Sequence, residues 1–482
     1  MSLSGALSNA LSGLTANARA ATLVSSNISN ALTDGYARRE LATSSNGMGF
    51  YGGVRVDGVT RSVNPVILAD RRLSDAEAGR GEQLQSFASR IELMVGDATE
   101  SGSLSGRMAA LENALITAAS NPSSTQRLDT VSRAAEDLAK TFNSLSDGIQ
   151  TARQDADRAI SFQVDSLNDT LEQVEALNTR ITRALVLGRD PSSLMDLRQK
   201  AIDTVAEAVP VRTVTREDGG IAVFTTGGVT LVDGKAATIE FSNTAIIVPH
   251  MTQANGLLSG LTINGKAVDT SANSQLAGGS LGAQFQIRDQ DAVAFQAQLD
   301  GVARDAIERL GPGGPDGTLT ATDPGVFMDA GSAFVATDEI GISGRITLNP
   351  IVSVNGGETW RLRDGLGAAA TGEVGDSSLL NGIYDTLTQA STPTSSSLDP
   401  TARSLSGLVS EWASGVGAFR VRQDGQLSYA QAQNVALTEL ELAEGVDTDQ
   451  ELQLLMLLEQ NYQANAKVMT TVDQMLQSIL AI

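Results

Sequence analysis

Side chains able to perform catalysis or bind a metal are scarce in this sequence. The chain holds one histidine, His250, and no cysteine. Without a Cys or a second His, neither a zinc site nor a Ser/His/Asp arrangement built around His250 has support. We expect His250 to be a surface or loop residue at the end of a strand.

Acidic and glycine-rich segments give no stronger chemical signal. Asp289 and Asp291 lack the Gly and the distant Glu of an EF-hand loop, and "GPGGPDGTL" is a single copy of what resembles a calcium-binding repeat. No glycine-rich phosphate-binding loop follows a predicted strand. A carboxylate pair for glycoside hydrolysis is an open alternative because acids are plentiful, although aromatic residues, which stack on sugars, are only 4% of the chain. We predict no catalytic residues, no cofactor and no metal.

Length and charge bound the class of protein. The 482 residues suffice for two or three domains and contain no apolar run of transmembrane length. The net charge of −22 argues against nucleic-acid or anionic-membrane partners, because neutralising phosphates requires basic patches. The first residues lack the basic start and the continuous apolar core of a cleavable signal peptide. The protein therefore stays inside the cell or leaves it without cleavage of the N-terminus.

Each end of the chain carries an apolar stripe with coiled-coil spacing. Residues 3–33 contain one charge and residues 452–482 contain three. In both segments apolar residues repeat every three and four positions, and one Asn interrupts each seam, a device that fixes register. The residues that we expect at an assembly interface are Leu3, Leu7, Leu14, Asn17, Val24, Ile28, Leu455, Leu458, Tyr462, Asn465, Met469, Val472, Leu476 and Ile479.

These terminal helices gain little stability alone. Burying each large apolar side chain of the first stripe stabilises by roughly 1.5 to 3 kcal/mol, whereas ordering each residue of the segment costs roughly 1.5 kcal/mol. We therefore expect both ends to be mobile in the free monomer and to order against each other and against neighbouring copies. The alternative is a single intramolecular helical hairpin that closes a globular domain.

Local signals set the expected ends of these helices. Asn27 is a poor helix-interior residue and Gly35 tolerates positive φ, so the first helix should end between them. Thr448 or Asp449 should cap the last helix, with Glu451 in its first turn. The acidic run 439–451 is interpreted as a solvated helix face.

The interior changes from helical to strand periodicity. Apolar residues recur at helical spacing from Leu138 to Leu185, through a phase shift at Ala156, before Gly188 and Pro191 end the helix. From Pro210 the period is two, with glycine-rich turns and one Asn-Gly hairpin signal. We expect an α+β multidomain protein, with a long-helix bundle or coiled coil formed by the N- and C-terminal segments and small β-rich domains inserted in the middle. The expected divisions are an assembly helix at 1–35, helical domain at 36–209, inserted β domain at 210–275, helical return at 276–310, β and loop insertion at 311–397, helical domain at 398–444 and assembly helix at 445–482.

Motifs at both ends resemble a known family. "SSNISNALTDGYARRE" (25–40) is similar to the segment after the first helix of bacterial flagellar axial proteins, and its two arginines resemble the hook-associated version. The residues that match this family motif are Asn27, Asn30, Thr33, Gly35 and Tyr36. "EGVDTDQELQLLMLLEQNYQANAKVMTTVDQML" (444–476) resembles the C-terminal segment of the same family. Residues 194–209, 219–234 and 276–303 are similar as well, whereas 311–397 have little that matches.

The resemblance to the hook-associated family implies a role and partners. It implies a structural adapter that joins the flagellar hook to the filament, leaves the cell unfolded through the flagellar type III export route and polymerises through its terminal helices. The implied partners are other copies of the chain, the hook protein, a second junction protein on the filament side and an export chaperone at the C-terminal helix. The implied location is the flagellum, outside the cell. A hook or rod axial subunit is the alternative, disfavoured by the long helical block from Leu84 to Val209, and a secreted polysaccharide-acting enzyme is less favoured.

Overall fold

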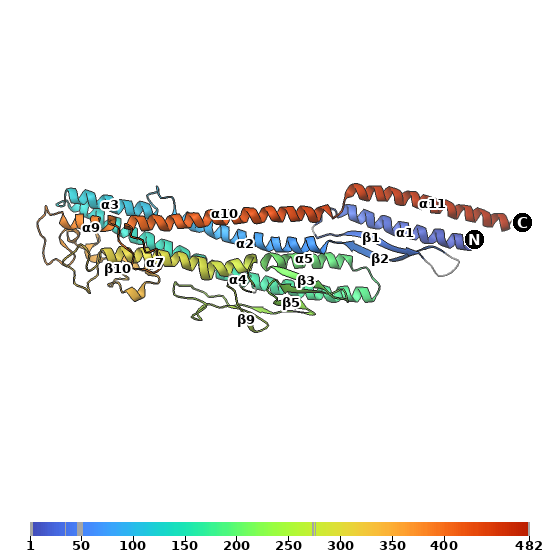
Figure 1. The fold of residues 1–482 in the computed structure, drawn as a ribbon, viewed down its shortest axis with the longest axis horizontal. Coiled ribbons are helices and arrows are strands. Elements are labelled where there is room, and N and C mark those ends of the chain that lie inside the picture. The colour runs from blue at the N-terminus through green and yellow to red at the C-terminus, as the bar shows by residue number, and fades with distance from the viewer. Residues whose placement is uncertain (1–2, 34, 46–51, 272–273, 275, 481–482) are drawn as a thin grey trace.

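The molecule is elongated, and the two ends of the chain lie at the same tip (Figure 1). Helices α1 (Leu3–Ser29) and α11 (Thr448–Leu480) form this tip with a hairpin of two strands, β1 (Arg38–Ser45) and β2 (Val54–Ser62). α1 ends between Asn27 and Gly35, as the sequence predicts. The computed structural model describes residues 3–33, 35–45, 52–271, 274 and 276–480.

Long helices run from the tip to the far end of the molecule. The longest, α4, has 62 residues, and its phase shift at Ala156, Ile160 and Val164 keeps all three side chains buried. α2 and α10 lie side by side, and a Cβ added to Gly81 of α2 would lie 3.2 Å from Leu427 Cδ1 of α10. The helices of this body are α2 (Pro65–Val95), α3 (Leu104–Ser120), α4 (Thr125–Val186), α5 (Ser192–Ala208), α6 (Gly279–Gln286), α7 (Ala292–Arg309) and α10 (Leu405–Ala443), with a π-helical turn at Ile287–Asp291 joining α6 to α7.

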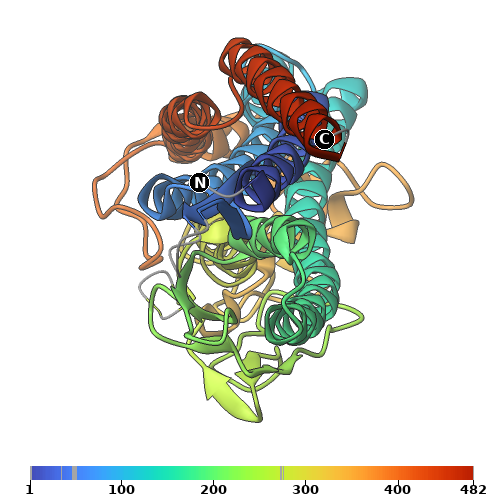
Figure 2. The same cartoon turned by 90° about the vertical axis from the view of Figure 1, so that its right-hand side faces the viewer.

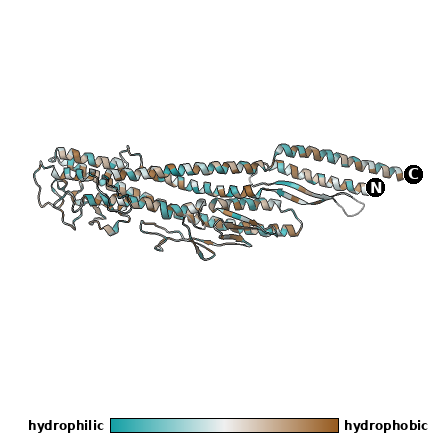
Figure 3. Ribbon diagram, viewed as in Figure 1, coloured by the Kyte–Doolittle hydropathy of each residue, from teal (hydrophilic) through white to brown (hydrophobic). Residues whose placement is uncertain are grey.

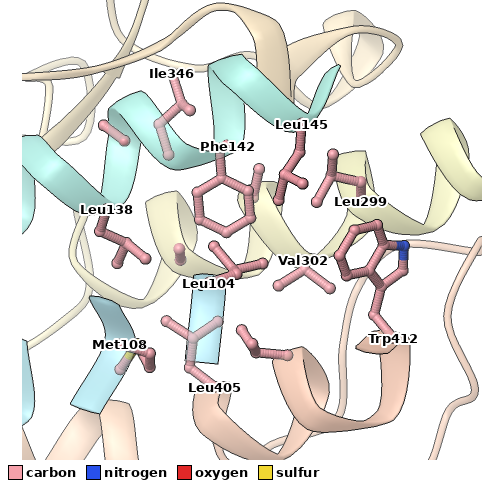
Figure 4. Packing of buried hydrophobic residues seen from close by; sticks show 14 of the residues in the cluster. Leu104, Met108, Leu138, Phe142, Leu145, Leu299, Val302, Ile346, Leu405 and Trp412 are labelled. Carbon is pink, nitrogen blue, oxygen red and sulfur yellow. The ribbon is translucent and has the colours of Figure 1, made fainter. Parts of the chain in front are cut away.

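Two hydrophobic cores share helix α4. The first core packs α2, α3, α7 and α10 against the N-terminal part of α4, and Figure 4 shows Phe142, Leu299 and Trp412 meeting there. The second core packs α5, α6 and the small strands against the C-terminal part, around Ile160 and Leu171. Neither core contains a residue of α1 or α11. The body is therefore packed independently of the tip.

Small antiparallel sheets cover one side of the helices (Figure 2). Asn264 and Gly265 have φ of 51° and 72°, as the predicted Asn-Gly hairpin turn requires. The four-stranded sheet contains β3 (Val211–Thr215), β4 (Ile221–Thr225), β5 (Thr230–Asp233) and β6 (Lys235–Ala236), in that order. The three-stranded sheet contains β7 (Ile239–Glu240), β8 (Leu261–Ile263) and β9 (Lys266–Val268).

Residues 311–397 combine short strands with helical turns. β10 (Phe327–Asp329) pairs with β11 (Ile346–Leu348), in the region where the sequence predicts strands. Helix α9 (Ser378–Thr388) was not predicted from the sequence, and its Leu380, Ile383 and Leu387 are buried in the first core. Their spacing is helical, but it stands in a segment rich in Gly, Ser and Thr. The remaining elements are α8 (Arg361–Asp364) and 3₁₀ turns at Ala336–Asp338, Ile342–Gly344 and Pro350–Val352.

The assignment of residues 36–209 to a helical domain is wrong at its start. Residues 38–45 and 54–62 form the paired strands β1 and β2, with Arg38 opposite Ser62 and Ser45 opposite Val54. A bulge between Ala42 and Thr43 bends the hairpin. Both strands contain β-branched residues and lack the three-and-four spacing of a helix, so pairing with each other satisfies their backbone groups.

Candidate assembly interface

The terminal helices α1 and α11 pack along each other in opposite directions (Figure 1). Asn27, near the end of α1, meets Glu451, near the start of α11. Gly13, earlier in α1, meets Asn465, later in α11. The two ends of the chain therefore contact each other within one molecule, and each helix has one face against its partner.

Small residues bring the two helices close together. The buried residues of α1 are Gly5, Ala10, Gly13, Ala16, Val24 and Asn27. A Cβ added to Gly13 would lie 2.9 Å from Asn465 Nδ2, closer than side chains ordinarily approach. The seam Asn of the last helix therefore lies directly over a glycine of the first.

The predicted stripe residues divide into three groups by burial. Val24 and Val472 are buried. Leu3, Leu7, Leu14, Asn17, Ile28, Leu455, Leu458, Asn465 and Met469 are half-buried. Tyr462, Leu476 and Ile479 are exposed. The α1–α11 contact within one molecule thus covers only part of the two stripes.

Large apolar side chains are exposed along α11. Hydrophobic and polar residues alternate along both terminal helices (Figure 3). The large side chains exposed on α11 are Leu452, Met456, Leu457, Tyr462, Val468, Met475, Leu476, Ile479 and Leu480. Such a concentration of exposed apolar surface on one helix is typical of a protein interaction site.

Asn27 ties the end of α1 to both β1 and α11. Its side chain is 1% exposed and uses its full hydrogen-bonding capacity. Nδ2 donates to the carbonyl of Arg39 (3.0 Å) and to Glu451 Oε2 (3.1 Å). Oδ1 accepts from the hydroxyl of Tyr36 (2.9 Å) and from the backbone N–H of Arg39 (3.0 Å). One asparagine therefore fixes the turn after α1 and its contact with the last helix.

Glu451 is a buried carboxylate at the start of α11. It is fully enclosed, and its charge is balanced by Arg38, whose Nε donates to Oε1 at 2.7 Å. This hydrogen bond raises the pKa of Arg38 above its ordinary value. Glu451 lies in the first turn, as predicted, but the interpretation of the whole acidic run as a solvated face is wrong here. The helix is capped by Asp447 rather than Thr448 or Asp449, because Asp447 Oδ1 accepts from the N–H groups of Asp449 (2.9 Å) and Gln450 (3.2 Å).

Arg39 extends this connection to the body. Its guanidinium lies 4.7 Å above the centre of the Tyr36 ring and donates to Asp196 Oδ2 of α5 at 2.6 Å. Arg61 of β2 donates to the other oxygen of Asp196 at 2.8 Å. The hairpin is therefore held to the body by two arginines that share one carboxylate.

The other motif residues shape the turn between α1 and β1. Asn30 Nδ2 donates to the carbonyl of Ser26 (2.8 Å), and the backbone of Tyr36 donates to the carbonyl of Thr33 (3.1 Å). Gly35 has φ of 76°, in the left-handed region that favours glycine. These residues thus stabilise the backbone conformation of the turn.

A second ionic connection lies where α10 reaches the tip. Arg71 of α2 pairs with Asp75 (2.6 Å), Asp203 (2.8 Å) and Glu441 (2.5 Å). The roles of Arg71 and Asp196 could not be predicted from the sequence, because ion pairs between distant segments leave no local pattern. The only available signal was a charged residue, such as Glu451, opening an otherwise charge-poor helix.

The predicted loop residue His250 is exposed in a turn. Across the part of the chain that the structure describes, no three His, Cys, Asp or Glu side chains are grouped so that they could hold a metal ion. Within that same part, no helix combines the length and apolar character needed to cross a membrane.

Comparisons with known proteins find two families of flagellar proteins. Residues 88–310 match the family described as the Flagellar hook-associated protein FlgK helical domain. Residues 443–482 match the family described as the Flagellar basal body rod FlgEFG protein C-terminal. The second match covers α11 and the turn before it.

Curated relatives give partial matches. "Flagellar hook-associated protein 1" of Escherichia coli is 25% identical over 300 residues, covering 60% of this chain and 53% of the relative. The protein of the same name from Bacillus subtilis is 25% identical over 289 residues, covering 54% and 56%. The chain thus spans about half the length of the curated relatives that it matches.

A solved structure, the flagellar hook junction protein FlgK from Burkholderia pseudomallei, is 18% identical with a TM-score of 0.46, covering 54% of this chain and 46% of that one. This likeness is too slight to bear on fold or function. The match to the helical domain and the relatives that share one printed name show that the chain is similar to flagellar hook-associated proteins, and the match at its C-terminal segment is to a family of flagellar rod proteins.

Proposed function

We propose that this protein is a structural adapter that joins the flagellar hook to the filament and polymerises through its terminal helices. The observation that carries the proposal is the set of large apolar side chains on α11 that α1 leaves exposed. In a polymer, neighbouring copies would cover these side chains and remove their apolar surface from water. The seven-residue spacing of both stripes favours coiled-coil packing between these helices.

The position of the terminal pair supports the same proposal. α1 and α11 lie at one tip and contribute nothing to the two cores of the body. We propose that residues 1–35 and 445–482 form the assembly module and that residues 36–444 supply the strands β1 and β2 and the body. The module orders fully only when neighbouring copies add their contacts to the intramolecular pair.

The proposed partners follow from the family. They are other copies of the chain, the hook protein on one side, a second junction protein on the other and an export chaperone that covers α11 before assembly. Export would follow the flagellar type III route and end outside the cell. The hook-associated family is structural, and we propose that this chain likewise has no catalytic activity.

Incorporation into flagella tests the assembly interface. Leu7→Asp with Leu14→Asp should abolish incorporation, because two charges would replace apolar contacts, while the body remains folded. The control is Ser8→Asp with Thr15→Asp, which adds the same charges at exposed positions of α1. Filaments that attach normally in the Leu7/Leu14 variant would contradict the proposal.

Removal of residues 452–482 tests the role of α11. The truncated chain should neither assemble nor bind its export chaperone, measured by co-purification from cells that express flagellar genes. Chaperone binding that survives the truncation would place the chaperone site elsewhere.

A hook or rod axial subunit is the second candidate, because the C-terminal match is to rod-type proteins. Electron microscopy of isolated flagella labelled with an antibody to residues 210–260 separates the two. A single band at the distal edge of the hook supports the junction, whereas label along the hook or within the rod supports the second candidate.

A further inference from the structure

A cavity of about 480 Å³ opens between the hairpin and the body, bounded by β2, α2, α5 and the turn joining β3 to β4. Three arginines line it: Arg61, Arg72 and Arg198. Its other walls are largely apolar, with Leu185, Ile202 and Ile221 among them. Three guanidinium groups around one cavity are unusual in a chain with 34 basic and 56 acidic residues.

Two of these arginines pair with carboxylates. Arg61 Nε donates to Asp196 Oδ1 at 2.8 Å, but Asp196 also accepts a hydrogen bond from Arg39. Arg72 Nε donates to Asp203 Oδ1 at 2.6 Å, but Asp203 also forms an ion pair with Arg71. Asp196 is thus shared by two guanidinium groups, whereas Arg71, which shares Asp203 with Arg72, also pairs with Asp75 and Glu441.

Arg198 has no carboxylate partner among the residues that the structure describes. The residue is 4% exposed, and Nη1 donates to two neutral acceptors, Asn178 Oδ1 and the carbonyl of Gly219, each at 2.8 Å. Nε is buried without an acceptor, and no described residue accepts from Nη2. Burial lowers the pKa of Arg198 to about 10, and the charges of Arg61 and Arg72 act in the same direction. A buried guanidinium with free donors is costly unless an anion satisfies it.

We propose that this cavity binds an oxyanion, a carboxylate or a phosphate, which accepts hydrogen bonds from Arg198 between the charges of Arg61 and Arg72. A guanidinium offers paired donors that match two oxygens of such a group. Apolar walls strengthen the interaction by lowering the local dielectric constant. The cavity volume admits either free phosphate or an acidic side chain inserted by a second copy of the chain. The site is independent of the proposed junction role.

Binding of inorganic phosphate to the dilute full-length chain tests the site. Titration by calorimetry at constant ionic strength, with chloride as the replaced anion, should show saturable binding of one phosphate to the wild-type protein. Arg198→Gln should bind at least about tenfold more weakly, because it loses a charge-assisted hydrogen bond. Arg212→Gln, at an exposed position of β3 without an acidic partner among the described residues, should bind as wild type.

A second measurement needs no variant that could disturb the fold. The Nε–Hε NMR resonance of Arg198 should shift on addition of phosphate to the wild-type chain, saturating with the same affinity. Absence of saturable binding, equal binding by Arg198→Gln, or an unmoved Arg198 resonance would overturn the proposal.

The source of the oxyanion is distinguished by self-association. If a second copy supplies a carboxylate, phosphate should compete with it and weaken self-association of the wild type in sedimentation experiments, but not that of Arg198→Gln. If the ligand is a free anion, phosphate should bind without changing self-association of either protein.

Discussion

Asn27 hydrogen-bonds both to a nearby backbone segment and to a residue near the other end of the chain. Its amide holds both backbone groups of Arg39 and one oxygen of Glu451, a residue 424 positions away. Because these groups are buried, removing the amide leaves several of them without partners. The energetic importance of Asn27 therefore exceeds that of a helix-capping residue on the surface.

Asn27→Ala should loosen the start of the α1–α11 contact. Loss of hydrogen bonds to buried groups should destabilise the local structure by about 2–3 kcal/mol. Amide exchange at residues 24–29 should therefore be on the order of a hundredfold faster. Hydrogen exchange followed by mass spectrometry measures this. Asn461→Ala, at an exposed position of α11, is the matched control and should leave exchange unchanged. Equal exchange in the two variants would show that the Asn27 contacts contribute little.

Motif residues were identifiable from sequence, but their partners were not. The Asn, Gly and Tyr of residues 27–36 mark a turn because each has a local conformational preference. Asp196 has no such local signal, and the predicted place of Glu451 in a first helical turn did not indicate that Arg38 would lie against it. Physical reasoning from sequence therefore found one side of each contact.

At the scale of elements, α1 has two faces of different kinds. One face is built from Gly5, Ala10, Gly13 and Ala16 and packs closely on α11. The leucine stripe lies beside it and is half-buried. Hydrophobic periodicity predicted the helix and the stripe, yet it gives small residues little weight. For that reason it did not indicate which face α11 would take.

Gly13→Val should force the terminal helices apart. Even a Cβ would lie 2.9 Å from Asn465 Nδ2, and the two further methyl groups make the position overpacked by about 1–3 kcal/mol. Amide exchange across residues 461–472 should accelerate, and a second change, Asn465→Ala, should restore part of the protection. Gly415→Val in α10 is the control, because a Cβ there meets nothing within 4 Å. No change in exchange would mean that the helices do not meet at Gly13.

The long helices and the first β region were predictable, whereas the β1–β2 hairpin and α9 were not. α4 carries an apolar row over most of its 62 residues, so its helical periodicity is too long to arise by chance from the composition. The hairpin strands are half-exposed on both faces and show no clean alternation of buried and exposed residues. Such strands are defined by their pairing, which a single segment does not reveal.

At the scale of the whole molecule, folding of the body and assembly at the tip should be separable. A fragment of residues 64–444 keeps both cores and the cap that Asn64 provides to α2. It should melt within a few degrees of the full-length body by circular dichroism and should fail to incorporate into flagella. A fragment that is unfolded at room temperature would show instead that the tip is needed for the body to fold.

Helix α4 gives the molecule a mechanical property. At 1.5 Å per residue, its 62 residues span about 93 Å, and both hydrophobic cores pack against this one helix. A twisting or bending load applied at one end is therefore transmitted along a continuous strut, with no flexible joint in which the motion could be absorbed.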